Sequence, residues 1–326
     1  MRRLLSMLTT AVLLSACDAP VSESGPDPVS LELRTFTSAD EGFHTNSMWV
    51  DTGAEVVVFD AQFTPALAQS LVDEIQSQTD SPIRWLVVTH PNPDKFNGAS
   101  TFRSLGAQVV ASQATAEAMP GVHAYKEAFF VGSGAFEPGQ YPALAPVDLT
   151  FDDALELPLA GGGQITLEVL DHGGVATTQT VAIVEDDDGP AQLVVGDLVA
   201  SRTHAWLEGG IVDGVAAPDL AQWRDALDDL AGLTDDPASP VYPGRGEPLP
   251  VAEAVGQQRD YLTALEQIVH AVLSEQDDPA AALGGDQAGA IYDEITARAE
   301  QAFPSYDHAY LITSGVYGLA WSLVSD

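Results

Sequence analysis

The segment IRWLVVTHPNPDKFNG at residues 83–98 constrains the fold of this chain more than any other stretch. It begins with a mostly apolar run that includes three β-branched residues and predicts a short strand buried on both faces: Ile83, Trp85, Leu86, Val87 and Val88. Pro91 and Pro93 then exclude a helix or a central strand, so the polar side chains of residues 89–95 are expected on a fixed loop. Open α/β sheets place their chemistry at the carboxyl ends of strands, so this loop is the first candidate site.

The rest of the chain alternates strand and helix patterns, which predicts a layered α/β domain. Alternating or apolar runs predict strands at residues 31–36, 46–51, 55–59, 108–111, 149–153, 164–170, 180–184, 192–195 and 240–242. Helical periodicity predicts helices from residue 64 onward and at residues 96–105, 220–230, 251–273, 288–301 and 306–323, with a bend where Gly256 interrupts the fourth. We therefore predict an α/β domain at residues 30–248 and a helical C-terminal extension at residues 249–326. We favour an outer helical layer for the extension over a dimerisation or capping element.

Residues 120–146 interrupt this alternation. They contain five aromatic residues among glycines and prolines and are too long for a routine connection. Such a segment is either a lid over a site or a poorly ordered insertion, and its aromatic content favours a lid.

The N-terminus has the features of a targeting segment. Two arginines precede an apolar run that is too short to span a bilayer, which predicts a signal peptide at residues 1–16. Residues 14–17, LSAC, resemble a bacterial lipobox, and Cys17 is the only cysteine. We predict lipidation of Cys17, a flexible tether at residues 17–29 and an exported lipoprotein anchored to the cell envelope, with its domain facing the periplasm or exterior. The alternative is an ordinary signal peptide with a chance cysteine.

The charge balance excludes one class of partner. The chain carries 48 acidic residues against 12 basic ones, a formal charge of −36, and only two lysines, Lys95 and Lys126. Such a field repels phosphate backbones, so no nucleic-acid partner is expected.

Three further polar motifs follow predicted strands. They are LDHGG with His172, VVGD with Asp197 and YPGRG with Arg245. Together with the loop at residues 89–95, their order resembles the metallo-β-lactamase superfamily over about residues 31–246. The resemblance implies a four-layer αββα sandwich with two adjacent zinc ions held by histidines and aspartates.

The resemblance also implies that part of the metal-binding motif has changed. Four of the seven ligand positions are kept and three are altered. The retained residues are His90, Asp94, His172 and Asp197, and the altered ones are Asn92, Lys95 and Arg245, each of which stands where a histidine is expected.

The alterations at the second metal site follow a charge pattern. Both of its histidines are replaced by cations, Lys95 and Arg245, while its carboxylates Asp94 and Asp197 remain. Lysine and arginine have no free acceptor for zinc at neutral pH, but each could neutralise a buried carboxylate. We infer that fixed positive side chains have replaced the second ion.

The first site is weakened. His90, His172 and Asp197 could still hold one zinc, with Asn92 as a poor fourth ligand. The nearby cations disfavour a divalent ion, so the sequence leaves zinc occupancy open.

The remaining histidines each have two interpretations. His204 either faces the site or packs beside Trp206. His44 and His123 are expected on loops, where they either line the entrance or are solvated. His270 and His308 are expected to be surface or packing residues of the helical tail.

Two functions remain in competition. The first is a hydrolase with at most one zinc, acting on an ester, thioester or amide, with Asp94, Lys95 and Arg245 as catalytic candidates that stabilise an oxyanion or bind an acidic group. The second is a metal-free pseudoenzyme that binds a small molecule or a protein at the envelope. The fold does not select between them, and the substrate stays unknown.

Overall fold

The computed structural model describes residues 31–186 and 189–325. The predicted signal peptide, the lipidation site Cys17 and the tether lie outside these residues. None of the helices that the structure describes is both long enough and apolar enough to cross a membrane.

Two six-stranded mixed sheets form the centre of the molecule. The first has the spatial order β1 (Arg34–Thr37), β2 (Asn46–Asp51), β3 (Val56–Phe59), β4 (Ile83–Val87), β5 (Gln108–Ser112) and β6 (Leu149–Phe151). The second has the order β14 (Leu249–Pro250), β13 (Pro240–Arg245), β10 (Gln192–Ala200), β9 (Thr180–Glu185), β8 (Gln164–Val169) and β7 (Ala154–Glu156). Strands β3 to β6 are parallel, and so is the pair β10 and β13. The strands predicted from sequence are thus found, with β10 and β13 extended by several residues.

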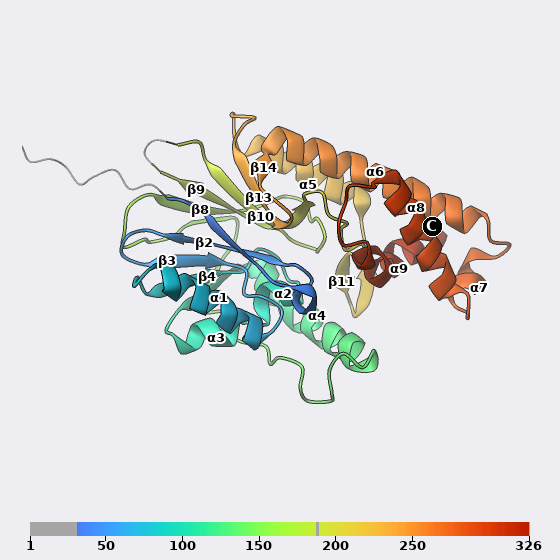
Figure 1. Ribbon diagram of the computed structural model, residues 1–326, viewed down its shortest axis with the longest axis horizontal. Helices are drawn as coiled ribbons and strands as arrows, with labels where there is room; N and C mark the ends of the chain where they lie inside the picture. The colour runs from blue at the N-terminus through green and yellow to red at the C-terminus, as the bar shows by residue number, and fades with distance from the viewer. Residues whose placement is uncertain (1–30, 187–188, 326) are drawn as a thin grey trace, which may run out of the picture.

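Helices cover the outer face of each sheet, which confirms the predicted αββα layering (Figure 1). Helices α1 (Pro65–Gln78) and α3 (Ala99–Ser104) lie on the first sheet, and α5 (Leu220–Gly232) and α6 (Val251–Ser274) lie on the second. Helix α1 begins as predicted, because the Thr64 side chain accepts a hydrogen bond from the Leu67 amide and Pro65 takes the first helical position.

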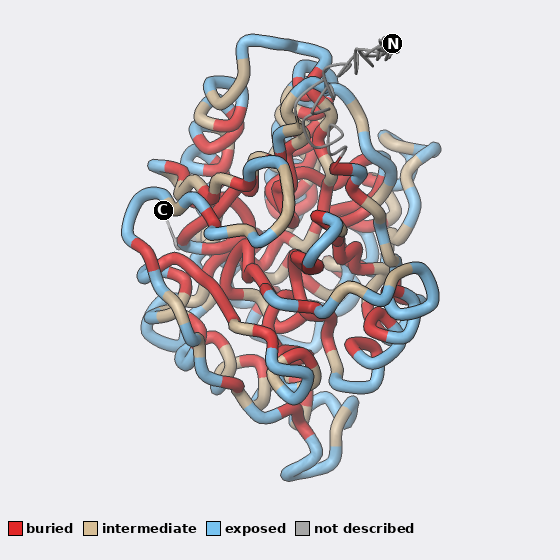
Figure 2. Tube along the Cα trace, turned by 90° about the vertical axis from the view of Figure 1, so that its left-hand side faces the viewer, coloured by how far each residue is buried: buried red, intermediate tan, exposed pale blue. Residues whose placement is uncertain are grey.

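The space between the sheets is filled by the inward-facing residues of both. Val57, Phe59 and Val87 of the first sheet belong to one buried cluster with Ile165 and Val184 of the second. Most residues of these strands are buried, and Figure 2 shows buried segments gathered in the middle of the molecule. Because both sheets are covered on both faces, the strand ends are held rigidly, and side chains attached there have fixed positions.

The C-terminal helices share a core with the second sheet. Helices α6, α7 (Pro279–Leu283), α8 (Ala288–Ala302) and α9 (Tyr310–Ser325) extend beyond one end of the sheets (Figure 1). Their buried residues form one cluster with those of β10, β13 and α5. Helix α6 runs without interruption across Gly256. Helix α7, which was not predicted, is capped by the Asp278 side chain.

Helix α4 (Gln113–Gly132) corrects the prediction for residues 120–146. Its first turn is capped by Ser112, and it buries Met119, Val122, Lys126 and Phe130 at helical spacing. That burial outweighs the cost of Pro120 inside the helix, about 3 kcal/mol. Only the second half of the predicted loop is irregular.

A second correction concerns the organising loop. Pro93 does not prevent a helix but begins one, α2 (Pro93–Phe96), because proline fits the first helical position. The helix predicted at residues 96–105 is therefore two short helices, α2 and α3. Asp94 and Lys95 lie on a helical turn, not on a loop.

Candidate functional site

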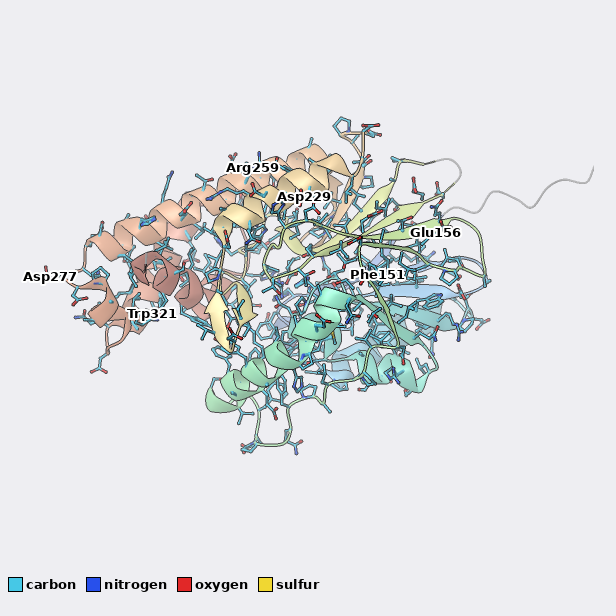
Figure 3. The ribbon with its side chains drawn as sticks, turned by 180° about the vertical axis from the view of Figure 1, so that it is seen from behind. Phe151, Glu156, Asp229, Arg259, Asp277 and Trp321 are labelled. Carbon is cyan, nitrogen blue, oxygen red and sulfur yellow. The ribbon has the colours of Figure 1, made fainter. Side chains whose placement is uncertain are left out.

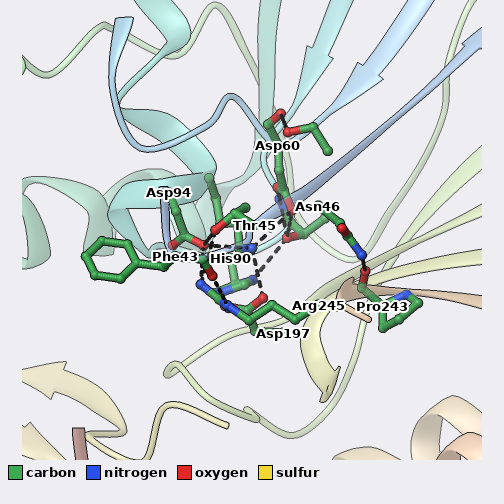
Figure 4. Close-up of polar contacts among 12 residues, drawn as sticks. Phe43, Thr45, Asn46, Asp60, His90, Asp94, Asp197, Pro243 and Arg245 are labelled. Atoms are coloured by element: carbon green, nitrogen blue, oxygen red, sulfur yellow. Dashed lines mark hydrogen bonds and ion pairs between the residues drawn. The ribbon is translucent and has the colours of Figure 1, made fainter. Parts of the chain in front are cut away.

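Four elements bring charged side chains together at one end of the two sheets (Figure 4). The loop after β4 carries His90, and α2 carries Asp94 and Lys95. Asp197 lies on β10, and Arg245 ends β13. These five residues, which the sequence singled out, are all at least nine-tenths buried.

Backbone irregularity aims Asp197 at this cluster. Strand β10 has register shifts against β13 on both sides of Gly196, which has φ +52°. Such irregularities redirect side chains near functional sites. A Cβ atom on Gly244 of β13 would lie 1.9 Å from Asp197 Oδ1, so only glycine allows the two strands to approach the carboxylate.

Lys95 is the centre of the cluster. Its side chain has no exposed surface, and its Nζ lies 2.9 Å from Asp197 Oδ1, 3.0 Å from Asp94 Oδ2 and 3.9 Å from Asp60 Oδ2. Burial by itself would lower the pKa of Lys95, but the three carboxylates outweigh it, so its pKa is raised. The side chain is therefore a fixed ammonium ion.

Arg245 binds the same two carboxylates from the opposite strand. Its Nη1 donates to Asp197 Oδ2 at 2.6 Å, and its Nη2 lies 3.1 Å from Asp94 Oδ2. Its Nε donates to the Phe43 carbonyl, and Nη2 also contacts Thr45 Oγ1. The guanidinium thus joins β10, β13, α2 and the loop before β2.

The carboxylates respond to these cations. Burial by itself would raise the pKa of Asp94. Lys95 and Arg245 together lower it by more than burial raises it, so the pKa of Asp94 lies below its ordinary value. For Asp197 burial is opposed first by Arg245 and then by Lys95, and the pKa falls well below the ordinary value. Both side chains are ionised at neutral pH, and each forms ion pairs with both Lys95 and Arg245.

Asp60, at the end of β3, is a member of the site that the sequence analysis missed. It is fully buried and accepts hydrogen bonds from the Thr89 amide and hydroxyl, and Thr89 Oγ1 lies 3.0 Å from His90 Nδ1. Burial raises the pKa of Asp60 to about 6, even though Lys95 opposes the shift. An aspartate directly after an apolar strand was the signal that could have found it.

His172 does not join this cluster. Its side chain is 40% exposed, and its Nδ1 lies 2.9 Å from Asp229 Oδ2 on α5, in the outer helical layer (Figure 3). The hydrogen bond with Asp229 raises the pKa of His172. The expectation that His172 completes a zinc site with His90 and Asp197 is therefore corrected, because its carboxylate partner holds it on the surface.

A pocket opens over the cluster. It encloses about 350 Å³ of empty space, including its open mouth. Asn92, Asp94, Asp197 and Arg245 form its polar side. The opposite side consists of Lys126 and four aromatic residues, Phe43, Phe63, Phe130 and Trp206. These aromatic residues come from four different segments, and the sequence did not indicate that they meet.

The comparisons with known proteins agree with the geometry. The family model described as the metallo-β-lactamase superfamily matches residues 40–245. The chain belongs to the metallo-β-lactamase superfamily. No curated protein matches it.

Solved metallo-β-lactamase structures resemble this superfamily member in fold. The metallo-β-lactamase from Pontibacter korlensis has a TM-score of 0.51 and 19% sequence identity, covering 72% of this chain and 99% of that one. The metallo-β-lactamase from Hirschia baltica has a TM-score of 0.48 and 18% identity, covering 72% and 98%. At such identity the Pontibacter likeness supports the fold alone. The C-terminal helices lie beyond the region that matches the family model.

The donor set of this superfamily member does not fit zinc. A catalytic zinc needs at least three histidine, cysteine or carboxylate ligands. Within residues 31–186 and 189–325, no group of three or more such side chains could hold a metal ion. The carboxylate oxygens that would serve as ligands are instead occupied by Lys95 and Arg245. Asn92 lines the pocket. Of the three stronger ligands predicted for the first zinc, only His90 and Asp197 lie in the cluster, with His90 Nε2 3.7 Å from Asp197 Oδ2.

The other histidines either contact neighbouring side chains or backbone, or are exposed. His204 is fully buried, its Nδ1 lies 3.2 Å from the Tyr261 hydroxyl, and burial lowers its pKa to about 4. His44 and His308 stack with ring centroids 3.8 Å apart. His123 lies on α4 and not on a loop as predicted, and its Nε2 is 2.7 Å from the Pro142 carbonyl. His270 is exposed on α6, as expected.

Proposed function

We propose that this protein is a metal-independent member of the metallo-β-lactamase superfamily that binds a small organic ligand in the pocket above the ion-pair cluster. The observation that carries the proposal is the position of Lys95, whose ammonium contacts Asp94 and Asp197 within 3.0 Å. A zinc ion would require those oxygens, and a positive charge already neutralises them.

The ion pairs give the pocket a rigid polar side. Arg245 connects both carboxylates and the loop carrying Phe43, so the polar groups are fixed before a ligand arrives. Preorganised groups lose little entropy on binding, which favours affinity in a small pocket. An apolar wall with a few fixed polar groups is the usual composition of a small-molecule site.

The alternative, hydrolysis of an ester, thioester or amide, has less support. Lys95 has no exposed surface, so its ammonium cannot contact a substrate oxyanion directly. All three guanidinium nitrogens of Arg245 already donate to protein oxygens. We therefore assign Asp94, Lys95 and Arg245 to the structure and electrostatics of the pocket, not to a catalytic step.

The proposal is tested by combining metal analysis with a ligand screen on the full mature chain. After incubation with zinc and gel filtration, we expect far less than one zinc per chain, with the same melting temperature before and after chelator. We expect at least one compound of a small-molecule library to raise the melting temperature. The Asn92→Trp variant, which fills the pocket, should lose that shift, and the control Leu105→Trp, at a residue 47% exposed, should keep it.

Two results would contradict the proposal. One is stoichiometric zinc that is removed by chelator with loss of stability. The other is a ligand-induced shift that survives Asn92→Trp unchanged.

We further propose that the protein acts at the bacterial cell envelope, held by a lipid on Cys17. The support is the lipobox-like sequence at residues 14–17. Mass spectrometry of the protein from membranes should find a diacylated or triacylated N-terminal cysteine, and Cys17→Ser should release the chain from the membrane fraction. An unmodified Cys17 in protein from membranes would refute this.

A further inference from the structure

We propose that the ligand of this pocket is an organic cation, an amine that carries a small aromatic or aliphatic group. The inference rests on the proposed function, because it names the class of ligand that the same pocket takes. Three independent features of the described residues carry it: the charge balance, an unused acceptor and the aromatic wall.

The first feature is an excess of negative charge around the pocket. The central cluster contains three carboxylates, Asp60, Asp94 and Asp197, against two cations, Lys95 and Arg245. On the other side, Lys126 forms a buried ion pair with Glu208 and adds no net charge. Leaving aside the imidazole of His90, whose Nε2 lies 3.7 Å from Asp197 Oδ2, one further positive charge balances these five groups, whereas an anion would add to the imbalance.

The second feature is an unused acceptor on a buried carboxylate. The hydrogen bonds and ion pairs of Asp94 within the described chain all end on Oδ2, where Thr45, Lys95 and Arg245 converge. Its Oδ1 is left to accept a hydrogen bond, and Asp94 lines the pocket although it is only 6% exposed. An ammonium group could donate to this oxygen, and a charged hydrogen bond of this kind is roughly twice as strong as a neutral one.

The cations that line the pocket are less available to an anionic ligand. Arg245 is engaged by Asp197, Asp94 and the Phe43 carbonyl. Lys126 is engaged by Glu208, and the same carboxylate oxygen accepts a hydrogen bond from Trp206 Nε1. An anion would have to compete with these buried carboxylates for each cation.

The third feature is the aromatic wall, which already holds a cation. The Nζ of Lys126 lies 4.9 Å from the ring centroid of Trp206. Phe43 and Phe130 complete the apolar surface opposite Asp94. Aromatic faces attract ammonium groups and accept apolar groups, so the wall suits both ends of such an amine.

The charge of the whole chain points in the same direction. The formal charge of −36 raises the local concentration of cations and lowers that of anions.

The test compares three probes that share one ring and differ in charge: benzylamine, benzyl alcohol and benzoate. Isothermal titration calorimetry on the full mature chain at pH 7 should give an affinity for benzylamine at least about tenfold above that for benzyl alcohol, with no binding of benzoate. The affinity for benzylamine should fall as salt is added, because the attraction is electrostatic.

Two variants identify the groups responsible. Asp94→Asn removes the unused anionic acceptor and should reduce benzylamine affinity about tenfold or more, while the affinity for benzyl alcohol changes little. Phe130→Leu keeps the volume apolar and should reduce benzylamine affinity about fivefold. If Asp94→Asn does not fold, as judged by circular dichroism, the Phe130→Leu variant and the salt dependence still decide the question.

The outcomes separate this inference from the proposed function. Equal or tighter binding of benzoate or benzyl alcohol would overturn the cationic ligand and leave the binding pocket intact. Failure of all three probes, with a hit in the library screen that Asn92→Trp abolishes, would also overturn only the cationic ligand. Failure of all three probes with no library hit would overturn both.

Discussion

Replacing Lys95 by methionine is expected to lower the free energy of unfolding by about 3–5 kcal/mol. The substitution keeps an unbranched apolar side chain but removes the ammonium from between Asp94 and Asp197, where its contacts are 3.0 and 2.9 Å. At an effective dielectric constant of about 20, each contact contributes about 5–6 kcal/mol of attraction before desolvation is counted. Most of that attraction offsets the cost of burying the ammonium, but the variant leaves buried carboxylates short of a partner.

The measurement is equilibrium urea unfolding of both proteins at pH 7, with the exposed cation Arg298 as a matched control. Arg298 also contacts two carboxylates, Glu275 at 2.8 Å and Glu294 at 2.7 Å, but its side chain is 30% exposed. Arg298→Met should cost much less than Lys95→Met, because solvent screens exposed pairs. A similar small loss for Lys95→Met would refute the view that Lys95 neutralises a buried acidic centre.

The pH dependence gives a second signature of the same variant. In the wild type the pKa values of Asp94 and Asp197 are lowered, so their contribution to stability is present above about pH 4 and is lost as pH falls through the folded values. Without Lys95 the pKa values of the buried carboxylates should rise. The deficit of Lys95→Met should therefore shrink as pH falls from 8 to 5, and a deficit that grows on acidification would contradict the reasoning.

Three further predictions test other parts of the structure. Burial raises the pKa of Asp60 to about 6, so this group favours folding at low pH, and its contribution of about 3 kcal/mol is lost as pH rises through 6. The carboxyl carbon resonance of Asp60 should titrate near pH 6, and a midpoint near 4 would contradict this. The double variant Lys95→His, Arg245→His should take up zinc and gain about 2.7 kcal/mol of stability at a zinc concentration 100 times its Kd, while the wild type gains none; equal uptake by both would refute the charge-replacement idea. Gly98→Ala should lower the free energy of unfolding by about 1–3 kcal/mol or more, because its Cβ would lie 2.0 Å from the Ala61 carbonyl oxygen. The control Gly132→Ala meets open space and should be neutral or stabilising in thermal unfolding. Equal effects of the two variants would contradict the packing at Gly98.

The sequence predicted the fold because its signals are local. A run of β-branched residues ending at Thr89, a capping threonine before Pro65 and helical periodicity in residues 251–273 each report on a few neighbouring residues. Local signals failed where burial competed with them. Pro120 and Pro93 are breakers by pattern, but the first lies in a helix with a well-buried face and the second begins one.

The site was predicted only in part for the same reason. Motif order identified His90, Asp94, Lys95, Asp197 and Arg245, and these meet at the strand ends. The same reasoning placed His172 with them. The position of Asp229 on α5, 57 residues further along the chain, decides otherwise.

The sequence by itself determined the layered α/β architecture, the family resemblance and the presence of two cations, Lys95 and Arg245, in the polar motifs that follow the strands. Only the tertiary structure decided that both cations bind the same two carboxylates, that Asp60 lies behind them and that aromatic residues from four segments form a pocket above. The physical reason is range. Secondary structure follows from residues within about one or two turns of each other, whereas Lys95 and Asp197 are 102 residues apart and meet only when two covered sheets have packed together.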